Sequence, residues 1–301
     1  MLDMTALTAL CAQLGCACLA EEPLSKHTSF QVGGACRAFV SVNSVETVRS
    51  LVAFLNEHAV PFTVLGRGSN IIAADEGYDG VIIGFGAEFS HITLEDGYLT
   101  CEAGASLKDV CLFALEHSLG GLEFAYGIPG SAGGALYMNA GAYGGEMDHV
   151  VYSAEVLEQD GTIRSIERED LALSYRHSRF MEQGGIILSV TLALELDEPH
   201  GIRGRMDDYM NRRRTKQPLE YPSAGSTFKR PEGDFASRLI EVCGLKGRSV
   251  GGAQVSEKHS GFVINTGGAT CADILALAEV VQREVEQQTG FRLELEPVLL
   301  K

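Results

Sequence analysis

The chain has 301 residues, 45% of them hydrophobic, and a formal net charge of −16 at pH 7. This length and apolar content predict a globular protein of two or three domains. The acidic balance argues against a general affinity for nucleic acid or anionic membranes, so an anionic ligand would need a local basic region.

The cysteines and the N-terminus bear on the cellular compartment. The eight cysteines include no C-x-x-C pair and no histidine at zinc spacing, so neither a metal site nor a redox motif is expected. Free thiols favour a reducing cytoplasm. The apolar start lacks the basic residues of a signal peptide, and no apolar run is long enough to span a membrane. Helical spacing of apolar residues over 2–14 predicts an amphipathic helix.

A β-α-β unit is predicted next. A strand at 38–42 precedes a helix that begins with a capping box of Asn43 and Glu46, and a second strand follows at 62–65. The turn 66–70 (Gly-Arg-Gly-Ser-Asn) comes directly after that strand, where α/β units place ligands. Its composition suits phosphate contacts, although a plain solvated loop has the same composition.

From Val81 onward the pattern changes to strands joined by hairpins. Asp-Gly pairs at 96–97 and 160–161 mark two turns. A helix is predicted from Ser106 to about Ser118, with Gly120 as its stop, and a buried strand at 185–194 closes this β-rich region.

The segment 126–146 is unusually rich in glycine, with seven glycines in 21 residues. Ordered glycines cost conformational entropy and are kept where the backbone takes positive φ or approaches something closely. Ser131 can cap a short helix over 132–139, which leaves backbone N–H groups open to a pyrophosphate. The spacing does not fit G-x-G-x-x-G. A phosphate-bearing cofactor is favoured, with a tight small-residue turn as the alternative.

The last third of the chain contains a local basic region. Its members are Arg203, Arg205, Arg212, Arg213, Arg214, Lys216, Lys229 and Arg230. A solvated helix face would account for such a run. Prolines flank the polar segment 223–229, however, which indicates a rigid ligand loop. Helices at 235–243 and 270–289 and a strand at 291–300 complete the chain.

Seven segments, in this order along nearly the whole chain, resemble the UDP-N-acetylenolpyruvoylglucosamine reductase family. They are 27–34 (HTSFQVGG), 66–70 (GRGSN), 127–134 (GIPGSAGG), 139–144 (NAGAYG), 175–176 (YR), 224–229 (AGSTFK) and Glu296. The short interval after Arg176 is similar to the compact class of the family, which lacks an inserted tyrosine-bearing loop. Pro297 departs from the pattern, because the family usually has a small branched residue there.

The resemblance implies an α+β protein. Residues 1–84 and 85–198 would form a two-part FAD-binding fold of the PCMH/vanillyl-alcohol-oxidase type, and 199–290 an α+β substrate domain. The strand at 291–301 is a candidate to return to the first part. No metal site is expected. No nucleic acid, membrane or obligate protein partner is expected either.

The resemblance also implies FAD held non-covalently, NADPH as electron donor, and reduction of the enolpyruvyl ether of a UDP-sugar to UDP-N-acetylmuramate in peptidoglycan precursor synthesis. NADPH would reduce the flavin, whose N5 then gives hydride to the enolpyruvyl carbon. The cofactor-binding residues would be Gly66, Arg67, Gly68, Ser69, Asn70, Gly127, Ile128, Pro129, Gly130, Ser131, Gly133, Gly134, Ala135, Ala140 and Gly141.

Catalytic roles follow from the charge that develops on the substrate carboxylate. Arg176 would bind and polarise it, because an arginine fork matches a carboxylate better than lysine does. Ser226 would donate a proton to the carbon, with Thr227 as the local competitor. Glu296 would orient Arg176 or act as an acid, and Glu294 shares its strand face by period-two spacing.

Substrate contacts are expected from Tyr175 and from three basic residues, Arg214, Lys216 and Lys229, which would bind the diphosphate. Two other function classes stay open at this point. A sugar or lactone oxidase on the same fold would share the glycine-rich motifs but not Ser226 and Glu296. A non-catalytic nucleotide-sugar binding protein would need the basic region and no flavin. A visible spectrum of the purified protein, with or without flavin bands, therefore separates the binding protein from a flavoenzyme.

Overall fold

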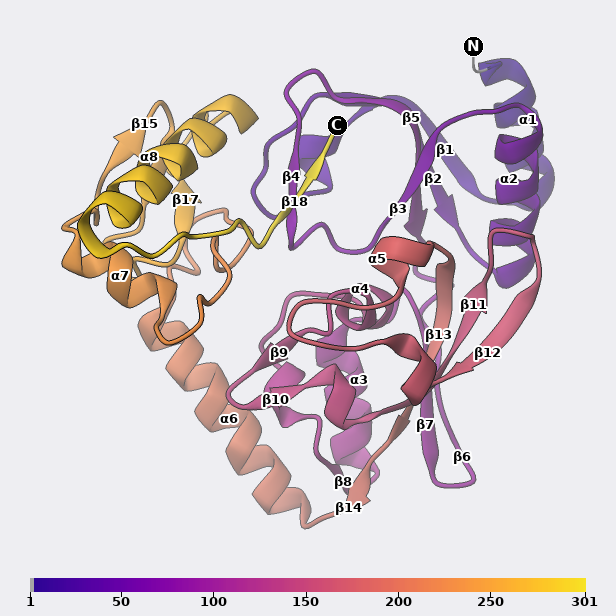
Figure 1. The fold of residues 1–301 in the computed structure, drawn as a ribbon. Coiled ribbons are helices and arrows are strands. Elements are labelled where there is room, and N and C mark those ends of the chain that lie inside the picture. The colour runs from indigo at the N-terminus through magenta and orange to yellow at the C-terminus, as the bar shows by residue number, and fades with distance from the viewer. Residues whose placement is uncertain (1–2) are drawn as a thin grey trace. The chain divides into compact units, whose positions relative to one another are not determined.

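The computed structural model describes residues 3–301, which form two compact units (Figure 1). The first unit contains the residues up to Ala20, Ala38–Arg67 and Gly80–Arg212, and the second contains Glu21–Arg37, Gly68–Asp79 and Arg213–Lys301. Each unit therefore combines segments that are far apart in the sequence. The division at residues 84, 198 and 290 stays a prediction.

The first sheet contains the predicted β-α-β unit with one unexpected strand. Its order is β1-β2-β5-β3, formed by β1 (Ala17–Pro23), β2 (Ala35–Val42), β5 (Tyr78–Phe85) and β3 (Phe62–Leu65). Helix α2 (Val45–Glu57) connects β2 to β3, but β5 lies between these strands and pairs with β3 in parallel. The predicted N-terminal helix is α1 (Met4–Leu14), and its proposed first apolar position, Leu2, lies outside the described residues.

The predicted cap of α2 is wrong by one residue. Ser44 is the N-cap, and its hydroxyl accepts a hydrogen bond from the Thr47 backbone N–H at 3.2 Å. The Asn43 side chain instead donates to the Gly15 carbonyl at 2.9 Å and accepts from the Thr47 hydroxyl at 2.6 Å. A tertiary contact therefore decides between two residues that both favour helix starts.

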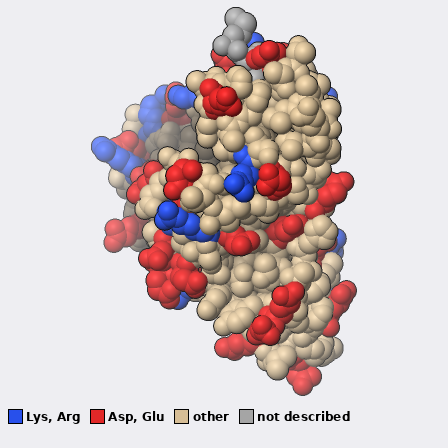
Figure 2. Space-filling model, turned by 90° about the vertical axis from the view of Figure 1, so that its right-hand side faces the viewer, with Lys and Arg blue, Asp and Glu red and all other residues tan. Residues whose placement is uncertain are grey.

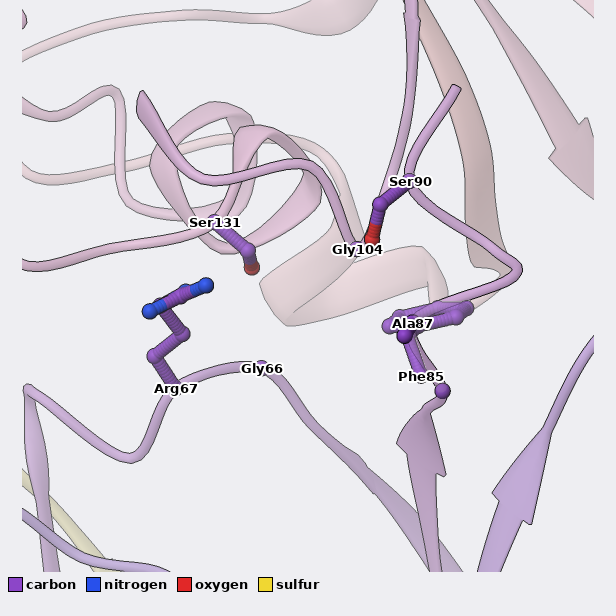
Figure 3. A pocket seen from close by; sticks show the side chains of 8 residues that line it. Gly66, Arg67, Phe85, Ala87, Ser90, Gly104 and Ser131 are labelled. Atoms are coloured by element: carbon purple, nitrogen blue, oxygen red, sulfur yellow. The ribbon is translucent and has the colours of Figure 1, made fainter. Parts of the chain in front are cut away.

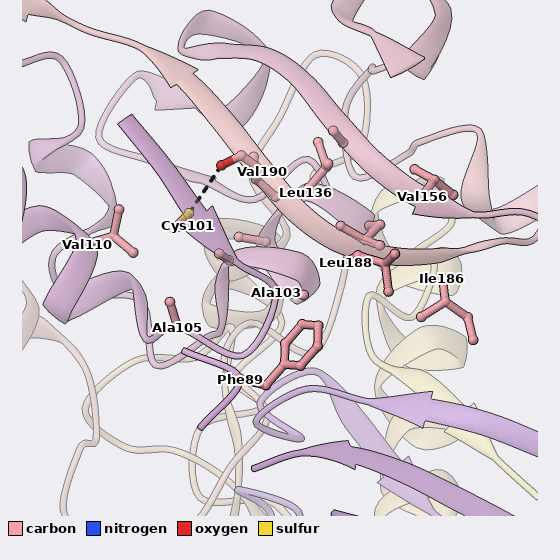
Figure 4. Close-up of a cluster of buried hydrophobic side chains, with 14 of the residues drawn as sticks. Phe89, Cys101, Ala103, Ala105, Val110, Leu136, Val156, Ile186, Leu188 and Val190 are labelled. Atoms are coloured by element: carbon pink, nitrogen blue, oxygen red, sulfur yellow. Dashed lines mark hydrogen bonds between the residues drawn. The ribbon is translucent and has the colours of Figure 1, made fainter. Parts of the chain in front are cut away.

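The second sheet is antiparallel and confirms both predicted hairpins. Its order is β12-β11-β13-β7-β6, formed by β12 (Ile163–Glu167), β11 (Val151–Leu157), β13 (Ile186–Ala193), β7 (Tyr98–Glu102) and β6 (Ile92–Glu95). The central strand β13 is almost wholly buried. In Figure 4, Leu188 and Val190 of β13 lie among apolar side chains, and the Cys101 thiol donates to the Val190 carbonyl.

Short elements connect this sheet to the glycine-rich segment. Helix α3 (Leu107–Glu116) begins at the predicted Ser106 cap but ends at His117, before Gly120. The remaining elements of this region are β8 (Leu119–Gly120), α4 (Ala132–Tyr137), β9 (Gly141–Ala142), β10 (Gly145–Glu146), α5 (Phe180–Gln183) and β14 (Glu195–Leu196). Helix α4 packs against β13.

Much of the basic region lies on one long helix, α6 (Pro199–Lys216). The sequence allows a helix here as one explanation of the basic residues but does not predict its bounds. Pro199 is its first residue, where a missing N–H costs nothing. Arg205 bonds to Glu123 at 2.6 Å and also pairs with Asp197. Residues 203–216 of the basic region therefore lie on a helix.

In the second unit, α7 (Ala236–Val242) and α8 (Cys271–Thr289) accompany an antiparallel sheet of β15 (Ser249–Val250), β16 (Ala253–Val255) and β17 (Val263–Asn265). Helix α8 begins with a capping box of Thr270 and Asp273 and ends at Gly290 in the left-handed conformation, in agreement with the helix predicted at 270–289.

The predicted terminal strand 291–300 is mostly irregular. Only β18 (Val298–Leu300) is a strand, and it pairs in parallel with β4 (Ile71–Ala73), as Figure 1 shows in yellow. A single bridge joins Leu295 to Phe228. Pro297 has no backbone N–H to donate, and the regular ladder starts directly after it.

Acidic side chains are spread over the face shown in Figure 2, in agreement with the net charge of −16. Among the described residues, no helix is long and apolar enough to cross a bilayer.

Candidate functional site

The glycine-rich segment is held in place by its own backbone. Ser131 accepts a hydrogen bond from the Gly134 N–H at 3.3 Å and so caps α4. The Leu107 N–H donates to the Gly130 carbonyl at 3.1 Å, and the Gly133 N–H donates to the Ala103 carbonyl at 3.0 Å. A Cβ on Gly133 would lie only 2.8 Å from the Ala103 Cβ. Glycine is required here by close packing against the second sheet.

A cavity of about 320 Å³ in the first unit joins this segment to the turn after β3. Its lining consists of Gly66, Arg67, Phe85, Gly86, Ala87, Ser90, Gly104 and Ser131. Figure 3 shows Arg67 and Ser131 on one side of the cavity, opposite Phe85, Ala87 and Ser90. The predicted cofactor segment 66–70 thus contributes Gly66 and Arg67 to this cavity, and the segment 127–135 contributes Ser131.

The glycines of the cavity keep side chains out of it. A Cβ on Gly66 would lie 2.7 Å from the Ser131 hydroxyl, and a Cβ on Gly104 would lie 2.4 Å from the Phe89 carbonyl. Both distances are far below van der Waals contact, so any larger residue at these positions would displace its neighbours or occupy part of the cavity.

The cavity chemistry fits an anionic, phosphate-bearing group. Its lining includes the cation Arg67 and no carboxylate. Across residues 3–301, no backbone hydrogen bond is donated by the N–H of Arg67, Gly130 or Ser131. Exposed or cavity-facing N–H groups near a helix start bind phosphate oxygens well. The residues present therefore fit the diphosphate of a dinucleotide cofactor.

The second half of the predicted turn, Gly68–Asn70, belongs to the second unit. Gly68 has a φ of +59°, and a Cβ there would lie 2.0 Å from the His27 carbonyl. Asn70 donates its side-chain amide to the Glu296 carbonyl at 3.3 Å and accepts from the Val298 N–H at 2.9 Å. In this unit, the turn is thereby joined to the terminal segment.

Arg176 lies at the tip of a tight turn. Ser174 and His177 exchange two backbone hydrogen bonds, of 3.2 and 3.1 Å, across it. Arg176 has a φ of +55°, which is unusual for a residue with a side chain. Its guanidinium donates to the Gly141 carbonyl at 3.1 Å and lies 5.1 Å from the centre of the Tyr175 ring.

Two buried polar side chains attach this turn to the glycine-rich segment. Asn139 is fully buried and donates to the Ser174 carbonyl at 2.9 Å, while its oxygen accepts from the Asp148 N–H at 2.9 Å. Ser178, also fully buried, donates to the Tyr137 carbonyl at 2.6 Å. The structure thus brings Arg176 to the predicted cofactor residue Gly141.

Ser226 and Thr227 have opposite surroundings, although they are adjacent. The Thr227 side chain is 1% exposed and accepts a hydrogen bond from the Val263 N–H at 2.8 Å. Ser226 is exposed, and its hydroxyl makes no hydrogen bond within residues 3–301. Thr227 holds the loop to the sheet, whereas the Ser226 hydroxyl is available to a ligand.

The two candidate glutamates also differ. The Glu294 side chain is 77% exposed and pairs with Lys229 at 3.7 Å. Glu296 is half-buried, and its N–H donates to the Thr227 carbonyl at 3.0 Å. The Lys229 N–H donates to the Glu294 carbonyl at 2.8 Å. Backbone bonds therefore hold Ser226, Lys229 and Glu296 together within the second unit.

The predicted diphosphate contacts lie in two places in the second unit. Arg214 and Lys216 are exposed in the last turn of α6. The Arg214 carbonyl accepts a hydrogen bond from Lys258, a residue that the sequence did not single out. The sequence also did not single out the cavity-lining Phe85, Gly86, Ala87, Ser90 and Gly104 or the anchor Ser178, and it included Asn139 in the motif 139–144 without a role of its own. The glycines that adjoin β5 and β7 were a usable signal.

Comparisons with known proteins agree with this geometry. Residues 36–167 match the family model described as FAD binding domain, and residues 217–300 match UDP-N-acetylenolpyruvoylglucosamine reductase, C-terminal domain. A solved structure of the UDP-N-acetylenolpyruvylglucosamine reductase of Thermus caldophilus is similar at a TM-score of 0.81 and 34% identity, over 95% of this chain and 99% of that one.

Curated relatives are similar along most of their length. The UDP-N-acetylenolpyruvoylglucosamine reductase of Clostridium perfringens strain SM101 is 49% identical over 92% of this chain and 90% of its own. That of Clostridium botulinum strain 657 is 48% identical over the same shares. The order of the motifs, the fold and these identities lead to one assignment: the chain belongs to the UDP-N-acetylenolpyruvoylglucosamine reductase family.

Proposed function

We propose that this chain uses FAD and NADPH to reduce the enolpyruvyl ether of UDP-N-acetylglucosamine to UDP-N-acetylmuramate, a step of peptidoglycan precursor synthesis. Identity of 49% over 92% of the chain to a reductase of that name carries the proposal. When bound, FAD supplies hydride to the enolpyruvyl group. The oxidase and the non-catalytic binding protein are set aside, because the family is a reductase family.

FAD would be held by the two glycine-bearing segments. Arg67 would offset the charge of the diphosphate, and open N–H groups at Gly130 and Ser131 would bind its oxygens. The remaining predicted contacts are 127–129, 133–135 and 140–141 in the first unit and 68–70 in the second.

Arg176 would bind the substrate carboxylate and stabilise the charge that develops on it. The guanidinium presents donors in a planar fork, which matches two carboxylate oxygens. A turn fixed by buried Asn139 and Ser178 limits the positions that Arg176 can take, so little entropy is lost when the substrate binds. Tyr175, exposed beside it, would contact the substrate as well.

Ser226 would deliver the proton to the substrate carbon. Its hydroxyl stays protonated at neutral pH, it is exposed, and it has no partner among the described residues. Thr227 is the weaker candidate, because its buried hydroxyl already accepts from Val263. Contacts within the second unit therefore favour Ser226.

Glu296 would act beside Ser226, either by orienting Arg176 or as an acid. Its half-buried position and the bond from its N–H to the Thr227 carbonyl support a fixed carboxylate. Glu294 is exposed and paired with Lys229, which supports a surface role. Arg214, Lys216 and Lys229 would bind the diphosphate of the UDP-sugar.

A cytoplasmic location also fits, because all eight cysteines are free in the described structure.

The test is a two-step anaerobic assay on the purified protein. A visible spectrum should show flavin bands, and denaturation should release the colour, because the cofactor is non-covalent. Addition of NADPH should bleach the bands, and addition of the enolpyruvyl UDP-sugar should restore them. Bands that stay bleached with this substrate but recover with oxygen alone would contradict the reductase function and favour an oxidase.

A further inference from the structure

The segment that carries Arg176 takes an unusual backbone path. Ala172 and Arg176 have φ angles of +50° and +55°. Residues with side chains rarely adopt this left-handed conformation, and they keep it only where the surrounding contacts fix it. The contacts that hold residues 171–179 therefore decide which positions the Arg176 side chain can take.

Asn139 and Ser178 hold the middle and the end of this segment. Asn139 donates to the Ser174 carbonyl, and Ser178 donates to the Tyr137 carbonyl. The beginning is held by another means, because across residues 3–301 the Ala172 carbonyl accepts no hydrogen bond from a backbone N–H. A side chain makes that contact instead.

The side chain is that of His177, the residue directly after Arg176. Its Nδ1 atom lies 3.2 Å from the Ala172 carbonyl oxygen. A carbonyl oxygen only accepts, so Nδ1 carries the proton in this bond. The Nε2 atom, on the other side of the ring, lies 3.2 Å from the Glu182 carboxylate on α5. The imidazole thus joins the start of the segment to the helix that follows it.

We propose that His177 is a positioning residue for Arg176. Its backbone exchanges two hydrogen bonds with Ser174 and its side chain bonds to Ala172, so one residue closes the turn at two points. This inference rests on the proposed role of Arg176 in binding the substrate carboxylate. Without the ring contact, the Arg176 guanidinium takes more positions, and fewer of them match the carboxylate during the reaction.

The bond to Ala172 should matter more than the contact with Glu182. The Glu182 side chain is 75% exposed, and the contact is an ion pair only when the ring is protonated. Exposed pairs of this kind contribute little. The bond to Ala172, in contrast, acts directly on a residue with positive φ.

Three variants and a matched control separate these contacts. His177→Phe keeps a ring and loses both ring nitrogens, whereas His177→Asn keeps a donor where Nδ1 lies and loses the contact with Glu182. Glu182→Gln removes only the carboxylate charge. His58→Phe is the control, because the His58 Nδ1 bonds to the Phe54 carbonyl at 2.8 Å at the end of α2, where no site residue is predicted.

Stopped-flow assays of the FAD-loaded full chain measure the effect on each half-reaction. His177→Phe should slow flavin reoxidation by saturating enolpyruvyl UDP-sugar about tenfold. Reduction by NADPH, FAD content and the thermal midpoint should match those of His58→Phe. His177→Asn should regain most of the lost rate, and Glu182→Gln should be close to wild type. A His177→Asn variant as slow as His177→Phe, or an equal loss in the NADPH step, would overturn the proposal.

Hydrogen exchange in the substrate-free protein tests the same contact without the reaction. The amides of residues 174 and 177, which bond across the turn, should exchange faster in His177→Phe than in wild type. His177→Asn should restore slow exchange, and His58→Phe should leave it unchanged. Slow exchange in His177→Phe would overturn the proposal.

The two measurements keep this proposal separate from the proposed function. A wild-type protein whose flavin the enolpyruvyl substrate does not reoxidise would refute the function, and the exchange rates would still decide whether His177 holds the turn. If His177→Phe does not fold, His177→Leu takes its place as a smaller side chain without a donor.

Discussion

The turn that carries Arg176 and the loop that carries Ser226 are fixed by different means. Buried side chains, Asn139 and Ser178, attach the Arg176 turn to the glycine-rich segment. Backbone hydrogen bonds between residues 227–229 and 294–296 hold the Ser226 loop. A loop held by its main chain tolerates changes in its exposed side chains, whereas a turn held by buried side chains does not. Substitutions of exposed side chains in the Ser226 loop should therefore change the reaction rate without changing stability, whereas substitutions of the residues that hold the Arg176 turn should change both.

The largest effect is expected from Ser226→Ala. Loss of a proton donor should slow reoxidation of the reduced flavin by the enolpyruvyl substrate by about 10²- to 10⁴-fold, with FAD content and reduction by NADPH unchanged. Stopped-flow absorbance follows both steps. An equal loss in the NADPH step would remove the proton-donor role.

Thr227→Val is the matched control for Ser226→Ala. It removes the acceptor of the Val263 N–H, so the free energy of unfolding should fall by about 1 to 3 kcal/mol. The rate per folded molecule should change much less than in Ser226→Ala. If Thr227→Val is the variant with the slow half-reaction, the two hydroxyls have been assigned the wrong way round.

Glu296→Gln should come next, with reoxidation slowed by about 10- to 100-fold, the lower part of the range for general acid–base groups. The substitution keeps the shape and the backbone bonds of the terminal segment and removes the ionisable group. Glu294→Gln should be nearly silent, because it loses only an exposed ion pair with Lys229. Slow reoxidation in Glu294→Gln would mean that Glu294, not Glu296, is the functional carboxylate. Normal reoxidation in both variants would mean that the terminal segment has only a structural role.

Asn139→Ala tests the other half of the comparison. Loss of the two hydrogen bonds of a fully buried amide should lower the free energy of unfolding by about 2 kcal/mol and loosen the Arg176 turn. Turnover per folded molecule should fall by about tenfold, since small misplacement of a binding group is costly. Thermal unfolding and steady-state kinetics measure both. Full activity in a destabilised Asn139 variant would show that the turn is not positioned by this residue.

The smallest effects are expected from Lys216→Met and Lys229→Met. Each should raise KM for the UDP-sugar by a few fold with kcat nearly unchanged, the pattern of lost uniform binding. Arg248→Met, an exposed residue outside the basic run, provides a control of equal charge change. An unchanged KM in both lysine variants would leave these residues as solvated surface.

Local signals in the sequence predicted most elements but not their partners. The Asp-Gly turns, the Ser106 and Ser131 helix starts and the helix at 270–289 depend on residues close in sequence, and all were predicted correctly. The place of β5 between β2 and β3 depends on pairing between distant strands, which no local pattern contains.

The errors have physical causes of the same kind. Asn43 and Ser44 both favour a helix start, and the contact of Asn43 with Gly15 decided the outcome. Helix α6 contains glycines that weaken its local signal, but Arg205 is held by Glu123 and Asp197. Seven motifs predicted the candidate site residues and included Asn139, yet the anchoring roles of Asn139 and Ser178 could be recognised only from their contacts.

The parallel pairing of β18 with β4 has a consequence for how the chain folds as it is made. Val298 lies 227 residues after its partner Ile71. At about 5 to 20 residues per second, the ribosome needs roughly 10 to 45 s to make the strand that completes this pair. During that interval one edge of β4 lacks this partner, and Asn70 lacks its bonds to Glu296 and Val298. The second unit can therefore be completed only late in translation, and a nascent chain stalled before residue 298 should leave the 68–79 segment open to proteases.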